Sequence, residues 1–294
     1  MASKDSASVH LFPEPSRHDP ESFGLVERSL AATPLLQIGE ARPSRDLARR
    51  DPNILDFFAS ARGAPIGALE FDVMAWVITR WFVAGRPPDG RLSSSRADIA
   101  RALYGVAPGG RQHELIDQAL QNLYDVNLDL SVLGAGEDGR RWRARRQRRI
   151  LQELDIREEG EETISLRLAT WLVEQLDANV VASIAWQVMR DLTGIAKRLA
   201  IYLAAHDGDF EPITSHTERL VVIVDDHLFE QFGITAKRER ERRGSLAKAA
   251  QRVDARDPRY RRVALERAGG KWVLRADRSQ GGQGGQVIPA LARP

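Results

Sequence analysis

The chain has 294 residues, of which 43% are hydrophobic, and it has a formal net charge of +2. This length favours two domains, each with enough apolar residues for a core. The absence of cysteine excludes disulfides and thiolate metal sites, and no apolar run reaches the ~18 residues of a membrane span. The first residues lack the apolar segment of a secretory signal, so we expect a cytoplasmic protein.

Residues 1–50 are rich in Ser, Pro, Arg and Asp, which is typical of a flexible N-terminal arm. Only Gly24–Leu30 and Pro34–Ile38 are apolar enough to dock, so we expect at most one short strand of this arm to pack on the body. At the other end, residues 279–294 contain the run QGGQGGQ, whose composition predicts a flexible tail.

Residues 51–155 follow the order of a winged helix, in which three helices precede a hairpin, with one additional short helix before them. The expected helices are Ile54–Arg62, Glu70–Ala84, Arg96–Tyr104 and Arg111–Asp125, and the expected strands are Asn127–Leu133 and Arg140–Ile150. Ser93–Ser95 offers an N-cap to the third of these helices. In the fourth helix we expect Leu115 on the buried side. We therefore predict a first winged-helix domain here.

The last helix of this domain has an acidic outer face. The residues of this face are Glu114, Asp117, Gln118, Gln121 and Asp125. Because carboxylates repel phosphates, we do not expect this helix to read DNA, and its face is instead a candidate for dimerisation or for a protein partner.

The hairpin that follows is strongly basic. Residues 140–149 read RRWRARRQRR, with seven arginines and no acid. We name four of them as candidate phosphate contacts: Arg140, Arg141, Arg143 and Arg145. The alternative is a solvated edge strand that its charge protects from aggregation.

Residues 150–185 are interpreted as a connection between two halves, with an acidic run at Glu153–Glu162. A second winged-helix domain is expected within residues 156–278. Its expected elements are helices at Trp186–His206 and Asp226–Phe232, strands at Phe210–Ile213 and Glu218–Val224, then a basic helix and strands at Arg262–Arg267 and Lys271–Arg275. This order repeats that of residues 70–150, so the predicted fold class is α+β with two tandem winged-helix domains.

The stretch from Ala236 to Arg278 carries the strongest functional signal. Between Lys237 and Arg278 there are 15 Lys/Arg and 6 Asp/Glu, a local charge of +9. At 100° per residue, Lys237, Arg240, Gly244, Lys248 and Gln251 lie opposite the apolar side formed by Leu246, Ala249, Ala250 and Val253. A basic helix followed by a hairpin is how a winged helix presents its recognition helix and its wing to a duplex.

We therefore predict double-stranded DNA as the partner. The candidate DNA-binding residues in this domain are Lys237, Arg238, Arg240, Ser245, Lys248, Gln251, Arg252, Arg267 and Lys271. The alternative is a solvated surface helix with ordinary i,i+4 ion pairs. In the hairpin, Tyr260 and Trp272 either stack on bases or, for Trp272, pack under the wing.

Catalytic motifs are missing from the sequence. Residues 134–139 match GxGxxG, but they lie between two expected strands and open no helix, so a hairpin turn is the better interpretation. The six histidines have no metal-ligand spacing, and His206 is expected to cap a helix end. Asp225 and Asp226 are expected to cap a helix start. We expect no enzyme activity, no cofactor and no metal site.

Three segments resemble plasmid replication initiators of the tandem winged-helix type, the replication initiator protein A family. The segments are ASIAWQVMRDLTGIAKRLAIYLAAH, FGITAKRERERRGSLAKAAQRV and KWVLRADR, and the resemblance covers residues 55–278. It implies a plasmid-associated protein that binds origin repeats (iterons), helps to open an A·T-rich segment, and recruits the host helicase and chromosomal initiator. Members of this family also form homodimers and repress their own promoters.

The same resemblance assigns roles to individual residues. The positions that match the major-groove helix are Lys237, Arg240, Lys248, Gln251 and Arg252, and those that match the wing are Arg267 and Lys271. Two alternatives stay open at this point: a winged-helix transcriptional regulator or partition adaptor with the same DNA chemistry, and an enzyme acting on DNA. The second would require an acidic metal-binding cluster that the sequence does not supply.

Overall fold

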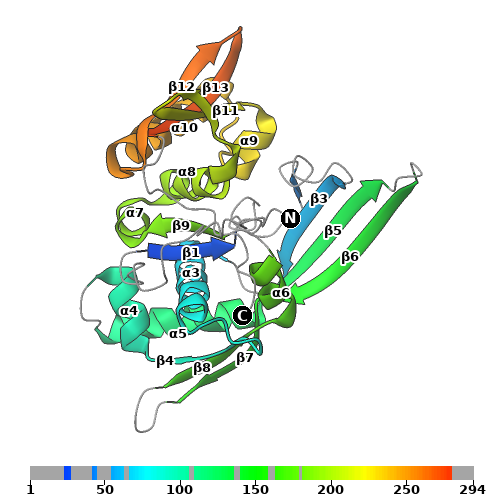
Figure 1. Ribbon diagram of the computed structural model, residues 1–294, viewed down its shortest axis with the longest axis vertical. Helices are drawn as coiled ribbons and strands as arrows, with labels where there is room; N and C mark the ends of the chain where they lie inside the picture. Colours follow the sequence, from blue (N-terminus) through cyan, green and yellow to red (C-terminus); the bar gives the residue numbers. More distant parts are fainter. Residues whose placement is uncertain are drawn as a thin grey trace, which may run out of the picture.

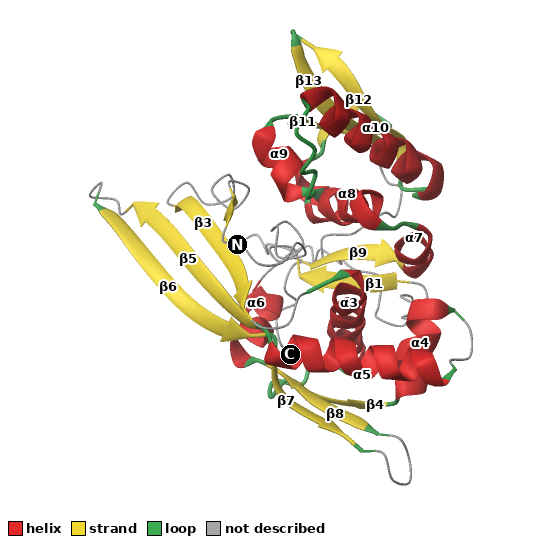
Figure 2. Cartoon of the chain, turned by 180° about the vertical axis from the view of Figure 1, so that it is seen from behind, coloured by secondary structure: helices red, strands yellow, loops and turns green. Residues whose placement is uncertain are grey.

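A computed structural model of the chain describes residues 23–27, 42–44, 54–62, 66–105, 109–135, 140–157, 163–178 and 181–279 (Figure 1). Most of the arm predicted at residues 1–50 lies outside these ranges, as does the predicted tail after residue 279. The described residues form two helix-rich units and four antiparallel β-sheets (Figure 2).

The first unit is a winged helix. Its elements are α3 (Ala68–Val83), β4 (Arg91–Ser94), α4 (Arg96–Tyr104), α5 (Gly110–Asp125), β7 (Leu151–Ile156) and β8 (Ile164–Leu168). The strands pair in the order β4-β8-β7, so the strand after the first helix lies beside the last strand. Ser95 caps α4 as predicted, because its hydroxyl accepts a hydrogen bond from the Asp98 amide at 3.1 Å.

The second unit repeats this plan. Its elements are α8 (Gly194–Ala205), η3 (Asp207–Asp209), β10 (Glu211–Thr214), β11 (Thr217–Ile223), α9 (Asp226–Gln231), α10 (Glu239–Arg256), β12 (Tyr260–Ala268) and β13 (Lys271–Ser279). The strand order is β10-β11-β13-β12, which is the first unit's order with β10 added at one edge. The predicted fold class, α+β with two tandem winged-helix domains, is therefore confirmed.

The wing of the first unit is not the hairpin that we predicted. The predicted hairpin forms, as β5 (Asn127–Ala135) and β6 (Arg141–Arg149), but it belongs to a separate sheet of order β2-β3-β5-β6. Figure 2 shows this sheet apart from the β4-β8-β7 wing. The wing strands come from the segment that we interpreted as a connection, and β8 lies beyond the predicted domain boundary at residue 155. Local alternation identifies a strand but not its partner, because pairing is long-range.

Two predicted helices are also wrong. Residues 54–62 form strand β3 (Ile54–Arg62), which pairs with β5 and with the short β2 (Arg42–Ser44). A short apolar run is compatible with a helix or a strand, and here pairing with β5 makes it a strand. The long helix expected at residues 186–206 is two helices, α7 (Trp186–Asp191) and α8, because Thr193 is extended and Gly194 has φ of 57°.

The predicted arm supplies two described strands, β2 and β1 (Phe23–Glu27), where we expected at most one, and β1 lies between the two units. β1 pairs with β9 (Val181–Ala185), which follows α6 (Thr170–Ala178). In β1, Val26 is fully buried, and the Leu25 amide donates to Thr79 Oγ1 of α3 at 2.7 Å. A Cβ on Gly24 would lie 2.7 Å from the Trp186 ring, so only glycine fits there.

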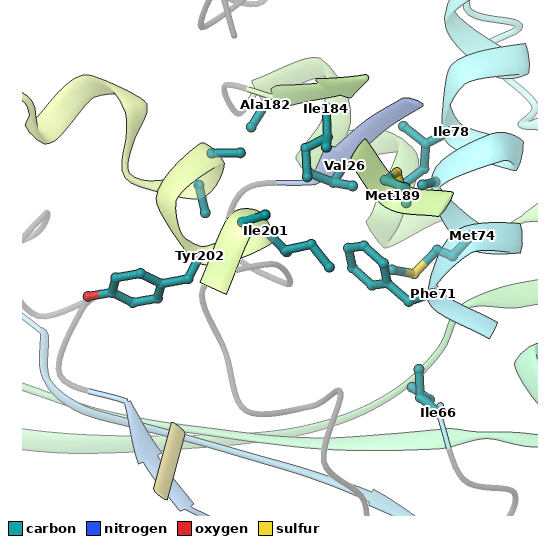
Figure 3. Packing of buried hydrophobic residues seen from close by; sticks show 14 of the residues in the cluster. Val26, Ile66, Phe71, Met74, Ile78, Ala182, Ile184, Met189, Ile201 and Tyr202 are labelled. Carbon is teal, nitrogen blue, oxygen red and sulfur yellow. The ribbon is translucent and has the colours of Figure 1, made fainter. Parts of the chain in front are cut away.

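The two units share one continuous core. Figure 3 shows Ile201 of α8 pointing towards Phe71 and Met74 of α3, with Val26 and Ile184 of the β1-β9 pair beside them. An ion pair lies at the same junction, with Lys197 Nζ of α8 2.5 Å from Asp72 Oδ2 of α3. The packing therefore fixes how the second unit is presented relative to the first.

Candidate nucleic-acid interface

Helix α10 docks through the apolar side that the sequence predicted. The buried residues of this helix are Leu246, Ala249, Ala250 and Val253. They lie on the side of α10 that packs against α8 and β12. The helix ends at Arg256, with Asp257 as its C-cap residue and Pro258, which cannot continue a helix, next in the chain.

The opposite side of α10 is exposed and polar. Arg240, Lys248, Gln251 and Arg252 are all exposed, whereas Ser245 is only half-buried at the edge of this face. Lys237 and Arg238 are exposed just before the first turn, where Arg238 is the N-cap residue. The fold thus brings the predicted residues of this stretch together on one outward surface.

The hairpin of β12 and β13 forms the wing of this unit. Its turn consists of Gly269 and Gly270, with φ of 55° and 81°, the left-handed backbone of a two-residue hairpin turn. Arg267 and Lys271 flank the turn, and both are exposed. The wing therefore presents two cations close to its tip.

The two aromatic residues of this hairpin are occupied within the protein. Tyr260 is 7% exposed and stacks on Phe210 with ring centroids 6.1 Å apart, so the base-stacking role we considered for it is wrong. Trp272 is half-buried under the guanidinium of Arg243, 5.1 Å from its ring centroid. Trp272 thus helps to hold the wing against α10, which agrees with the packing alternative.

Ion pairing divides the 15 Lys/Arg between Lys237 and Arg278 into two groups. Eight are paired with a carboxylate: Arg238, Arg242, Arg243, Arg256, Arg259, Arg262, Arg275 and Arg278. The other seven have no carboxylate partner among the residues that the structure describes, and we call them the open cations: Lys237, Arg240, Lys248, Arg252, Arg261, Arg267 and Lys271. All seven are exposed.

Some of the paired arginines stabilise the sheet of the second unit. Asp277 of β13 accepts hydrogen bonds from Arg275 of the same strand at 2.6 Å and from Arg219 of the neighbouring strand β11 at 2.7 Å. Burial alone would raise the pKa of Asp277, but these hydrogen bonds keep it below its ordinary value. These side chains are therefore committed to the sheet, which leaves the open cations as the available positive surface.

The prediction included six of the seven open cations and missed Arg261. We began the strand at Arg262, whereas β12 begins at Tyr260, so Arg261 was left outside the hairpin. Its guanidinium donates to Ser279 Oγ at 2.6 Å, and Arg252 likewise donates to a hydroxyl, Thr193 Oγ1, at 3.3 Å. Both side chains are exposed and bond only to neutral hydroxyl groups among the described residues.

In the first unit, the equivalent helix α5 has the acidic surface that we predicted. Glu114, Gln118, Gln121 and Asp125 are exposed. Asp117 is different, because it accepts from Arg96 Nε at 2.8 Å and so holds an arginine whose side chain is only 8% exposed. The prediction that Leu115 is buried is wrong: it is 43% exposed, because α5 packs on the side that carries its other apolar residues.

The β5-β6 hairpin, which we call the inserted hairpin, carries the remaining candidate phosphate contacts. Arg140 and Arg141 are exposed. Arg143 and Arg145 lie in β6, where they pair with Leu133 and Ser131 of β5. Their side chains lie outside the described part of the structure. β6 is an edge strand of its sheet, so both interpretations of this hairpin, phosphate contact and protected edge, still apply.

The residues singled out for other chemistry have structural roles. Asp225 caps α9 by accepting from the Leu228 amide at 2.9 Å, and Asp226 pairs with Arg242. His206 is the C-cap residue of α8. The described residues contain no group of three His, Cys, Asp or Glu that would hold a metal ion. None of the described helices is both long and apolar enough to span a membrane.

No protein-family model and no curated protein matches this sequence. Among solved structures, the chain is similar to domains 2 and 3 of RctB, with a TM-score of 0.57 and 10% identity over 86% of this chain and 98% of that one. A second structure of RctB domains 2-3 gives a TM-score of 0.46 and 12% identity over 82% and 92% of the two chains. At this identity, the first match shows a shared fold.

Proposed function

We propose that this chain is a non-enzymatic protein that binds double-stranded DNA sequence-specifically and initiates replication of a plasmid. The observation that carries the proposal is the set of seven exposed open cations on α10, its N-terminal flank and the β12-β13 wing. Cations without a carboxylate partner are available to phosphates and base edges, and here they lie on the two elements with which a winged helix contacts a duplex.

Two likenesses support replication over other uses of DNA binding. The sequence resembles the replication initiator protein A family, and the fold is that of domains 2 and 3 of the replication initiator RctB. By the first resemblance, the DNA would be a set of iterons in a plasmid origin next to an A·T-rich segment. The protein would act in the cytoplasm, bound to the plasmid, and would recruit the host helicase and chromosomal initiator.

The second unit would read the DNA. Helix α10 would lie in the major groove, where Arg240 and Lys248 reach guanine edges or phosphates and Gln251 reads adenine. Arg267 and Lys271, at the wing tip, would bind the adjacent backbone. The first unit, with its acidic α5, would serve the homodimer or a host protein instead of reading bases.

Footprinting on the DNA that flanks the gene tests this proposal. We expect protection of several direct repeats beside an A·T-rich tract, together with replication of a plasmid that carries this segment. Protection of a single palindrome without replication would instead support a transcriptional regulator, and it would contradict the proposal.

A charge-reversal variant tests the surface. Lys237→Glu, Arg240→Glu and Lys248→Glu together should weaken binding to the footprinted duplex at least ~1,000-fold at physiological salt, because at least three phosphate or base contacts become repulsive. The matched control is Arg91→Glu, Arg101→Glu and Arg157→Glu, which makes the same charge change at exposed sites in the first unit. If both triple variants, each folded by circular dichroism, bind equally well, α10 is not the DNA-reading helix.

A further inference from the structure

Gly244 lies at the centre of the exposed face of α10. Four residues before it is Arg240 and four residues after it is Lys248, so an open cation lies one helical turn away on each side. Gly244 is itself exposed. The cationic surface of the recognition helix therefore has a position without a side chain at its middle.

No requirement among the residues that the structure describes explains this glycine. It lies in the interior of an 18-residue helix, away from either end, and its φ is not in the left-handed region. A Cβ built on it meets nothing within 4 Å. A glycine inside a helix destabilises it relative to alanine, so the fold alone would favour alanine here.

Other glycines of the same chain show what an internal requirement looks like. A Cβ on Gly24 would clash with Trp186, and Cβ atoms on Gly90 and Gly105 would lie 2.9 Å from Leu168 O and Arg190 Nη1. Gly90 and Gly105 also have positive φ, of 72° each. Gly244 has neither feature, so the described residues give no internal reason for a glycine at this position.

We propose that Gly244 is the point of closest approach between α10 and DNA, where the missing side chain lets the helix backbone sit deep in the major groove. This inference rests on the proposed function. The major groove is about 12 Å wide and an α-helix with side chains is about 10–12 Å across, so one Cβ changes how deeply the helix enters. The base-reading side chains on either turn reach their partners only at that depth.

Stability and affinity should therefore respond in opposite directions to Gly244→Ala. The melting temperature should rise by about 2–3 °C, because alanine favours the helix. Affinity for the footprinted duplex should fall at least tenfold, and Gly244→Gln should lower it further. Affinity for a random-sequence duplex should change less than threefold, because phosphate contacts tolerate a shallower position.

Ala255→Gln is the matched control. Ala255 is exposed and lies three turns further along the same face of α10, at its C-terminal end, so a side chain is enlarged away from the centre. Its affinity for the footprinted duplex should stay within twofold of that of the natural protein. This control separates a local steric effect from a general effect of larger side chains on the helix.

The outcomes distinguish this inference from the proposed function. If Gly244→Ala binds the footprinted duplex as tightly as the natural protein while the triple charge reversal does not, DNA binding stands and the close approach is wrong. A melting temperature below that of the natural protein would also overturn the inference, since the fold would then require the glycine. If the triple charge reversal binds normally, the proposed function itself fails.

Discussion

The two winged-helix units share the strand order of their three common strands, but the equivalent helices α5 and α10 expose side chains of opposite charge. In the first unit, α5 exposes Glu114 and Asp125, and in the second α10 exposes Arg240 and Lys248. The difference extends inward, because α5 uses Asp117 to hold the nearly buried Arg96, whereas α10 docks through Leu246 and three small apolar residues.

This comparison shows how one architecture presents two different surfaces. Helix α10 docks mainly by apolar residues, with Arg242 and Arg243 half-buried beside Asp226 and Trp272, and it leaves Arg240, Lys248 and Arg252 exposed. A helix that docks partly through a charged pair, as α5 does, has a carboxylate that belongs to the fold. The function proposed for each unit thus rests on its surface and not on its topology.

Removing one acid from each helix should separate these roles most clearly. Asp117→Ala should lower the free energy of unfolding by about 3 kcal/mol, because the guanidinium of Arg96 loses its carboxylate in a site with little access to water. Glu241→Ala on α10 should change it by less than about 0.5 kcal/mol, because its pair with Arg238 is exposed and 3.7 Å long. Urea unfolding of both variants measures the difference, and equal values would remove the distinction between the helices.

The junction between the units should be sensitive to pH. Burial raises the pKa of Asp72 from 3.8 to about 6, although Lys197 lowers it by charge and hydrogen bonding, and nearby Glu70 raises it further. The charge of Asp72 also contributes, after burial, to a raised pKa of Tyr104 on α4. Asp72 thus binds its proton more tightly in the folded chain than in the unfolded one.

The sign of the pH effect follows from this shift. Between about pH 4 and pH 6 the folded state holds more protons, so stability should fall as the pH rises through this window, by about 2 kcal/mol, and then level off. Asp72→Asn should abolish this component of the pH dependence. Urea unfolding at pH 4.5 and 7 measures it for both proteins, and parallel curves for the two would contradict the assignment.

Much of the second unit could be predicted from the sequence because its signals are local. The apolar spacing of Leu246, Ala249, Ala250 and Val253, the stop at Asp257-Pro258 and the turn at Gly269-Gly270 each lie within a few residues. The candidate cations were therefore placed on the right elements. Which arginines are open could not be predicted, because carboxylates such as Asp207 and Asp226 come from elsewhere in the chain.

The first unit was harder to predict because its sheet joins segments far apart in sequence. Arg91 of β4 pairs with Arg167 of β8, and in the separate β2-β3-β5-β6 sheet Ile54 pairs with Gly134; nothing local to these strands specifies the partner. An inserted hairpin that directly follows α5 looks like a wing in sequence, whereas the real wing starts at Leu151. The strand pairing of the first unit, more than its secondary structure, could not be predicted from the sequence.

The inserted hairpin is the feature that the second unit lacks, and it should have the smallest effect on DNA binding. Arg140→Ala with Arg141→Ala should weaken binding to the footprinted duplex and to a random duplex alike, by about threefold. The slope of log K against log salt concentration should also become less steep by about one to two, because each lost phosphate contact reduces this slope by about one. Gln147→Ala, an exposed change in the same strand, is the control. If affinity and salt slope stay unchanged while light scattering shows increased self-association, the arginines protect the β6 edge and the hairpin does not touch DNA.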